Sequence, residues 1–180
     1  LKQYSKQTVL EIDSLDIPVG QTFGLVGNNG AGKTTLFSTL LDLIKPSKGR
    51  VTNNGVEVSQ SEDWKSFTTA FLDETFLIGY LMPEEYFYFI GELRGLNKKQ
   101  VDSFLAQFED FFHGEILGVK KYLIDLSKGN QKKAGVIAAL IVEPAVVIVD
   151  ERFANLERTT QIILKALDKE LSENKDVSVH

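Results

Sequence analysis

Short apolar segments and amphipathic segments alternate along the chain. Residues 8–17 carry alternating apolar side chains and predict a strand. Residues 22–26 and 145–149 predict two more, because they are short apolar runs of the kind that parallel sheets bury on both faces. The run at 22–26 leads into a predicted helix that ends at Pro46 and carries these apolar residues on one side: Leu36, Phe37, Leu40, Leu41 and Ile44. Asn54-Gly55 predicts a hairpin. The whole pattern predicts an α/β fold around a parallel sheet.

The middle of the chain is predicted to be helical. Pro83 suits the first turn of a helix, and Asn97 followed by Gln100 resembles a capping box. After this box, one helix face carries the apolar residues Val101, Phe104, Leu105, Phe108, Phe111 and Phe112. Residues 131–142, before Pro144, and residues 159–171 predict two further helices.

Composition narrows the classes of function. The 180 residues are 43% apolar, which suits one domain with a hydrophobic core. The net charge of −5, from 20 basic and 25 acidic residues, argues against nucleic acid as a partner, because nucleic-acid binding relies on a basic surface. The sequence has no cysteine, which excludes thiolate metal sites and cysteine nucleophiles. The longest apolar run, residues 136–142, is too short to cross a membrane, so we expect any membrane role to come through a partner.

Residues 27–34 match the Walker A pattern, between an expected strand and an expected helix. Glycines let backbone N–H groups approach phosphate oxygens, and the helix that begins near Lys33 adds its positive end. Lys33 is expected to reach the β- and γ-phosphates, and the Thr34 hydroxyl to ligate Mg²⁺. The residues expected to bind ATP are Gly27, Asn28, Asn29, Gly30, Ala31, Gly32, Lys33, Thr34 and Thr35. The alternative, a glycine-rich turn without a ligand, is disfavoured by the strand and helix that flank it.

The apolar run at 145–149 ends in Asp150 and Glu151. Acids at the carboxyl end of a buried parallel strand lie where α/β sheets bind ligands. Asp150 is expected to hold Mg²⁺ through water, and Glu151 to act as the catalytic base or to orient the attacking water. The alternative is a charged strand end without a role, which the Walker A segment upstream disfavours.

Between these segments, residues 126–131 read Leu-Ser-Lys-Gly-Asn-Gln and resemble the Leu-Ser-Gly-Gly-Gln signature of ABC-transporter ATPases. The resemblance covers the whole chain in order, and the Walker A and signature segments are similar to those of bacterial exporters. It implies a P-loop NTPase fold with one ABC ATPase domain, residues 1–180, truncated at its C-terminus. The core would comprise about residues 1–74 and 134–180, and an inserted helical subdomain about residues 75–133.

The resemblance implies further site residues. Tyr4, upstream of the first expected strand, corresponds to the adenine-stacking aromatic, unless it is simply an exposed tyrosine near the chain end. Glu74 stands in the Q-loop, where it would approach the Mg²⁺ ion. Ser127, Lys128 and Gly129 would contact the γ-phosphate across a head-to-tail homodimer, or a heterodimer with a related ATPase. A dimer is expected because a signature so far along the chain does not reach its own phosphate loop.

Five departures from the family pattern bear on activity. Lys128 replaces the first signature glycine, Asn130 replaces the signature glutamine, and Glu74 stands where glutamine is commonest. These three are compatible with function. Arg152-Phe153 follows the Walker B acids where Pro-Thr is usual, and Glu157 replaces the D-loop aspartate. Both of these changes weaken the expectation of efficient hydrolysis.

The resemblance implies that ATP binding and hydrolysis power transport through a separate transmembrane permease, with this chain as a peripheral subunit at the cytoplasmic face of the membrane. One alternative is an ATP-dependent switch that hydrolyses weakly or not at all. Another is a soluble ABC-type protein outside transport, acting on ribosomes or DNA; the single domain and acidic balance disfavour it. The sequence does not encode the transported substrate.

Residues 75–89 carry more apolar side chains than one core face absorbs, including the four consecutive aromatics at 86–89. We expect them to dock a membrane partner, and the alternative is that they are all buried within the chain. His180 follows residues 177–179, which look like the start of a strand. It could therefore correspond to the histidine that contacts the γ-phosphate in this family. That segment is too short for a strand across the sheet, so we expect His180 to be a chain-end residue.

Overall fold

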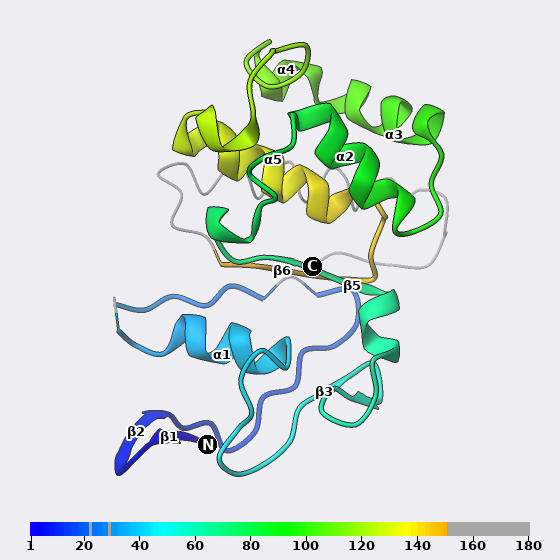
Figure 1. Ribbon diagram of the computed structural model, residues 1–180. Helices are drawn as coiled ribbons and strands as arrows, with labels where there is room; N and C mark the ends of the chain where they lie inside the picture. The colour runs from blue at the N-terminus through cyan, green and yellow to red at the C-terminus, as the bar shows by residue number, and fades with distance from the viewer. Residues whose placement is uncertain (22, 29, 151–180) are drawn as a thin grey trace. The chain divides into compact units, whose positions relative to one another are not determined.

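A computed structural model describes residues 1–21, 23–28 and 30–150 (Figure 1). The chain divides into two compact units. The described part of the first unit is Leu1–Phe67, and that of the second is residues 68–150. This division does not test the expected inserted subdomain at 75–133, which stays a prediction.

The first unit begins with a small hairpin that packs against a helix. Strands β1 (Lys2–Tyr4) and β2 (Gln7–Leu10) pair antiparallel, and β2 contacts helix α1 (Lys33–Leu40). A second hairpin, β3 (Thr52–Asn53) with β4 (Val56–Glu57), precedes the short 3-10 helix η1 (Asp63–Ser66).

The second hairpin confirms the Asn-Gly prediction. Asn53 pairs with Val56, so Asn54 and Gly55 form a two-residue turn. Their φ angles are 48° and 78°, which is the left-handed geometry that this turn requires at both central positions.

Helix α1 begins at Lys33, directly after the glycine-rich loop, as predicted, but it ends before Pro46. Asp42 takes a left-handed φ of 52°, and its N–H donates to the Thr39 carbonyl at 3.2 Å. The Leu43 N–H donates to the Ser38 carbonyl at 2.9 Å. This pair of bonds is a Schellman motif, which satisfies the last carbonyls of the helix and ends it.

Two strand predictions in the first unit are wrong. The strand expected over residues 8–17 ends with β2 at Leu10. A second strand is expected over residues 22–26, but residues 23–26 form no strand. The side chains of Phe23 and Val26 are 47% and 93% exposed. A strand must pair its backbone groups with a neighbour, and no described residue pairs with 23–26. An apolar run without that neighbour does not form the buried strand that its composition suggests.

The second unit is a helical layer on a parallel strand pair. Strands β5 (Thr68–Phe71) and β6 (Val146–Val149) pair from Thr68↔Val146 to Phe71↔Val149, and the helices of this unit lie on one side of them (Figure 1). Between the strands come η2 (Glu74–Phe76), α2 (Pro83–Glu92), α3 (Lys98–Leu105), η3 (Ala106–Phe108), α4 (Glu109–Phe112), η4 (Leu123–Asp125) and α5 (Lys128–Leu140). The expected strand at 145–149 is thus confirmed as β6.

The helical predictions for the middle of the chain are largely confirmed. Pro83 is the first residue of α2. Asn97 and Gln100 form the reciprocal capping box: each side chain accepts the other residue's backbone N–H, at 3.1 and 2.9 Å. The expected apolar face is buried except for the half-buried Phe111, but it is divided among α3, η3 and α4 rather than carried by one helix.

Helix α5 forms the centre of the second unit. Its buried residues include Ala134, Val136, Ile137 and Leu140, and it contacts both β5 and β6. The helix predicted at 131–142 starts three residues earlier, at Lys128, because the Ser127 side chain caps it. A Cβ at Gly135 would fall on the Phe71 ring of β5, so glycine is what lets the helix pack this closely on the strand.

Candidate nucleotide site

Within residues 27–34, the backbone conformation requires glycine at positions 30 and 32. Gly30 and Gly32 have φ angles of 85° and 88°, which other residues adopt only under strain. A Cβ at Gly32 would also lie 2.7 Å from the Val9 carbonyl oxygen. The loop therefore reaches the start of α1 only with glycine at position 32, and the β1–β2 hairpin lies against it.

The Lys33 ammonium is held by the loop itself. Its Nζ donates to the carbonyl of Gly27 and, at 3.0 Å, to the carbonyl of Asn28. Backbone N–H groups at a helix N-terminus and an ammonium are donors that suit an anionic phosphate, and the Thr34 hydroxyl is an oxygen ligand that suits Mg²⁺. The residues present thus fit the predicted ligand, Mg·ATP.

Two acidic residues of the second unit, Glu74 and Asp150, follow the carboxyl ends of the paired strands β5 and β6. Asp150 directly follows β6, and its N–H donates to the Phe71 carbonyl, at the end of β5, at 3.1 Å. Glu74 begins η2 just after β5. The carboxyl ends of adjacent parallel strands therefore bring both side chains to one edge, as expected for a magnesium site in an α/β sheet. Thr34 lies in the first unit, so the full set Thr34, Glu74 and Asp150 stays a prediction.

No group of three or more histidine, cysteine or acidic side chains that could hold a metal occurs among the described residues. A magnesium ion does not require such a group, because it usually keeps several waters and phosphate oxygens as ligands.

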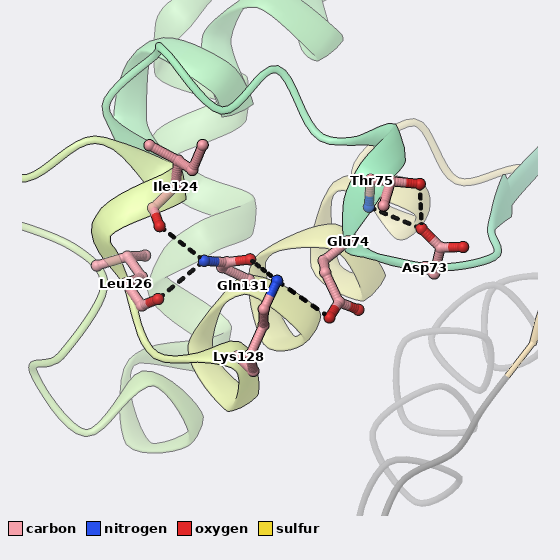
Figure 2. Close-up of polar contacts among 7 residues, drawn as sticks. All are labelled: Asp73, Glu74, Thr75, Ile124, Leu126, Lys128 and Gln131. Carbon is pink, nitrogen blue, oxygen red and sulfur yellow. Dashed lines mark hydrogen bonds and ion pairs between the residues drawn. The ribbon is translucent and has the colours of Figure 1, made fainter.

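Glu74 is in an environment that keeps it charged. The pKa of its carboxyl lies below the ordinary value, chiefly because the carboxylate accepts a hydrogen bond from its own backbone. The hydrogen bond and charge of Lys128 and the charge of Lys132 lower the pKa further, while partial burial opposes them. The Lys128 Nζ lies 3.3 Å from Glu74 Oε1 (Figure 2).

The signature residues begin helix α5. Ser127 is its N-cap: the Ser127 Oγ accepts the Asn130 N–H at 3.2 Å, and the residues Ser127, Lys128 and Gly129 are exposed. The Asn130 amide donates to Glu115 Oε2 at 3.0 Å. A pocket of about 340 Å³ opens beside this turn, lined by Glu115, Val119, Lys121, Asp125, Leu126, Ser127 and Asn130.

Gly129 has no structural need to be glycine within the second unit. A Cβ there would meet only the Ser127 Oγ, at 4.0 Å, and its φ is not in the left-handed region. Glycine in a helix costs about 0.5–1 kcal/mol relative to alanine. Packing within the second unit therefore does not explain the glycine at this position.

Tyr4 lies within the first strand, β1, and not upstream of it as expected. Ser5, with a φ of 57°, turns the chain so that Tyr4 pairs with Gln7, and this pairing places Tyr4 in a strand. The Tyr4 side chain is 51% exposed, and the Lys2 Nζ lies 4.8 Å from its ring centroid. An exposed ring is what a stacking role requires, and this role stays a prediction.

Several predicted features lie outside the described residues. These are Asn29 of the phosphate loop, the catalytic Glu151, Arg152-Phe153, Glu157, the helix expected at 159–171, and His180.

Sequence reasoning missed two contacts beside the signature. Gln131 is buried, and its Nε2 donates to the carbonyls of Ile124 and Leu126, which fixes the segment before the signature (Figure 2). The Lys128–Glu74 contact was missed as well. Its signal was in the sequence: both positions depart from the family pattern, and the two departures have opposite charge.

The phosphate loop ahead of α1 and the signature turn ahead of α5 define an ATP-binding protein of the P-loop class with an ABC-type signature. The model of the ABC transporter family matches residues 10–154, and the chain belongs to this family.

Curated relatives and a solved structure agree with this family. The chain is 30% identical over 168 residues to the ABC transporter ATP-binding protein NatA of Bacillus subtilis (strain 168), covering 90% of this chain and 66% of that protein. It is 31% identical over 185 residues to the uncharacterized ABC transporter ATP-binding protein MJ1023 of Methanocaldococcus jannaschii, covering 96% of this chain and 61% of that protein. It thus spans less than two thirds of the length of either relative. A solved ATP-binding subunit of an ABC transporter aligns with a TM-score of 0.75 at 23% identity, covering 96% of this chain and 72% of that one, which shows the fold.

Across residues 1–21, 23–28 and 30–150, no helix has the length and apolar character needed to cross a membrane.

Proposed function

We propose that this chain binds Mg·ATP and hydrolyses it to power transport through a separate membrane protein. The observation that carries the proposal is the exposed signature turn, Ser127, Lys128 and Gly129, in a chain that has its own phosphate loop. A P-loop protein that only binds nucleotide has no use for a second phosphate-contacting turn at the start of another helix.

In the proposed reaction, water attacks the γ-phosphorus of Mg·ATP, the bond to the oxygen that bridges the β- and γ-phosphates breaks, and ADP and inorganic phosphate are released. Lys33 binds the phosphates and neutralises charge, while Thr34, Glu74 and Asp150 orient the metal or its waters. Glu151 accepts the proton of the attacking water. Ser127 and Gly129 of a second copy, or of a related ATPase, contact the γ-phosphate and exclude bulk water. The catalytic residues therefore come together only in a head-to-tail dimer.

The departures at Arg152-Phe153 and Glu157 favour a second candidate, an ATP-dependent switch that hydrolyses slowly. Both candidates require the same ATP-bound dimer, and turnover separates them.

Gly129→Ala is expected to weaken the ATP-dependent dimer without weakening the fold. The added methyl group has room within the second unit, and alanine favours the helix by about 0.5–1 kcal/mol. In the dimer it would meet the bound nucleotide, and overpacking of about 1–3 kcal/mol lowers the association constant by about 5- to 150-fold. Sedimentation with Mg·ATP and urea unfolding measure the two effects. Equal dimerisation of wild type and Gly129→Ala would contradict the proposed role of the signature, and Lys121→Ala, an exposed change beside the same turn, is the control.

The membrane partner is proposed to dock on an apolar patch of the second unit. Tyr86 and Phe87 are buried, so half of the aromatic run belongs to the core. The exposed apolar patch consists of Phe76, Ile78, Tyr80, Tyr122 and Ile124. Its two segments are joined by backbone hydrogen bonds, from the Ile124 N–H to the Gly79 carbonyl at 3.0 Å and from the Leu123 N–H to the Leu81 carbonyl at 2.9 Å. Clustered exposed aromatics of this kind mark interaction sites, and this one suits a partner at the cytoplasmic membrane face.

Phe76→Asp with Tyr80→Asp is expected to lower recovery of the membrane partner by about tenfold or more, because charge is placed where aromatic side chains would be desolvated. The two side chains are 56% and 80% exposed, so the fold and Mg·ATP binding stay intact. Co-purification with a candidate transmembrane permease, sought in the reading frames next to the one for this chain, measures the effect. The control is Leu93→Asp, which is equally exposed but lies outside the patch. Equal recovery in both variants would place the docking surface elsewhere.

A further inference from the structure

Two unusual residues of the second unit contact each other. Glu74 stands at the Q-loop position where glutamine is commonest, and Lys128 stands where the signature has its first glycine. The two side chains form an ion pair at 3.3 Å (Figure 2). Glutamine and glycine at these positions could not make this contact, since one has no charge and the other has no side chain. Each departure therefore has its physical explanation in the other.

Both ends of the ion pair are anchored. Glu74 is the first residue of η2, whose N-cap Asp73 accepts the Thr75 N–H at 2.7 Å. Lys128 is the first residue of α5, next to the N-cap Ser127. The two side chains therefore face each other from fixed backbone positions.

The buried Gln131 orients Lys128. Its Nε2 donates to the carbonyls of Ile124 and Leu126, at 3.0 and 2.8 Å, which leaves its Oε1 directed at the Lys128 Nζ, 3.5 Å away. The ammonium therefore lies between the Gln131 amide oxygen and the Glu74 carboxylate (Figure 2). This arrangement connects the segment before the signature to the Q-loop.

We propose that Lys128 is a positioning residue that competes with magnesium for the Glu74 carboxylate. This inference rests on the proposed function and adds a regulatory step to the same site. The Lys128 ammonium occupies one oxygen of the Glu74 carboxylate and repels a second cation at this range, so the ion pair weakens the binding of a divalent cation to Glu74. Glu74 is therefore expected to bind the metal more tightly when the Lys128 side chain has moved away.

The exposure of the pair fits a contact that opens readily. The Lys128 side chain is 73% exposed and that of Glu74 is 20% exposed. Exposed ion pairs contribute little to folding, because water and salt screen them. The pair thus adds little to the stability of the unit, whereas its effect on a competing divalent cation is direct. Its opening makes entry of magnesium depend on the position of the signature turn.

The first test measures the magnesium concentration needed for half-maximal ATP binding by the full chain. Lys128→Gln is expected to lower this concentration by about two- to fivefold, the range of an exposed ion pair. In the Glu74→Gln background, the same change is expected to have little effect, because Lys128 acts through Glu74. A merely structural role, or a general effect of removing a positive charge, would shift both backgrounds equally and would overturn the proposal.

The second test needs no nucleotide. Urea unfolding of wild type, Lys128→Gln, Glu74→Gln and the double variant gives the coupling between the two side chains. Each variant changes the equilibrium constant of unfolding by some factor. At low salt, we expect the factor for the double variant to differ from the product of the two single factors by about two- to fivefold, and at high salt by less. The Glu62–Lys65 pair, at 2.7 Å with side chains 85% and 54% exposed, is the control for a fully solvated ion pair, with Glu62→Gln and Lys65→Gln.

The two tests separate failure of the inference from failure of the proposed function. Wild-type protein that binds no Mg·ATP would overturn the proposed function, and with it the competition for magnesium. Normal binding with additive effects of Lys128→Gln and Glu74→Gln in both tests would overturn the inference alone. Coupling in both tests supports it.

Discussion

Lys33→Ala is expected to lower the affinity for Mg·ATP by about 10- to 100-fold. Hydrogen bonds to charged groups contribute about 1.5–3 kcal/mol each, and the variant loses those from the ammonium to phosphate. The fold is expected to survive, because among the described residues the Lys33 Nζ donates to the carbonyls of Gly27 and Asn28, which are exposed and can bond to water. Calorimetry with and without magnesium measures the affinity.

The control for this variant is Lys48→Ala. It removes an exposed ammonium of the same unit outside the phosphate loop, so its affinity for Mg·ATP should match that of wild type. Unchanged affinity in Lys33→Ala would remove the phosphate loop from the proposed site. An equal loss in both variants would mean that the measured binding reflects general attraction to positive charge.

Glu151→Gln is expected to bind Mg·ATP normally and to hydrolyse it at least about a hundredfold more slowly. A general base contributes about 10²–10⁴ to the rate, and glutamine keeps the size of the side chain but cannot accept the proton. Glu151 follows Asp150, whose backbone is hydrogen-bonded to the end of β5, so the predicted base comes directly after the acid at the sheet edge. Steady-state phosphate release by the full-length protein measures turnover.

Glu143→Gln is the matched control, because Glu143 is an exposed glutamate before β6, at the opposite end of the strand from Asp150. It should leave turnover unchanged. Wild-type turnover in Glu151→Gln would assign the base to another residue, with Glu74 the next candidate. Turnover that is already negligible in the wild-type protein with its membrane partner would favour the slow switch.

The features that the sequence determined by itself are those set by neighbours a few residues away. The Asn97–Gln100 capping box, the Asn54-Gly55 turn and the start of α1 after Gly32 depend on backbone angles and hydrogen bonds within one turn of chain. The family of the chain was also readable, because the Walker A and signature motifs are local runs whose order along the chain carries the information.

The tertiary structure decided the features that need a partner from elsewhere in the chain. An apolar run such as 22–26 becomes a strand only where another strand completes its hydrogen bonds, and no local pattern states whether one is present. The parallel pairing of β5 with β6 brings Glu74 and Asp150 to one edge. The Lys128–Glu74 pair likewise requires the packing of α5 against η2. The sequence showed two departures of opposite charge, but the distance between the charged atoms sets their interaction, and only the folded chain fixes that distance.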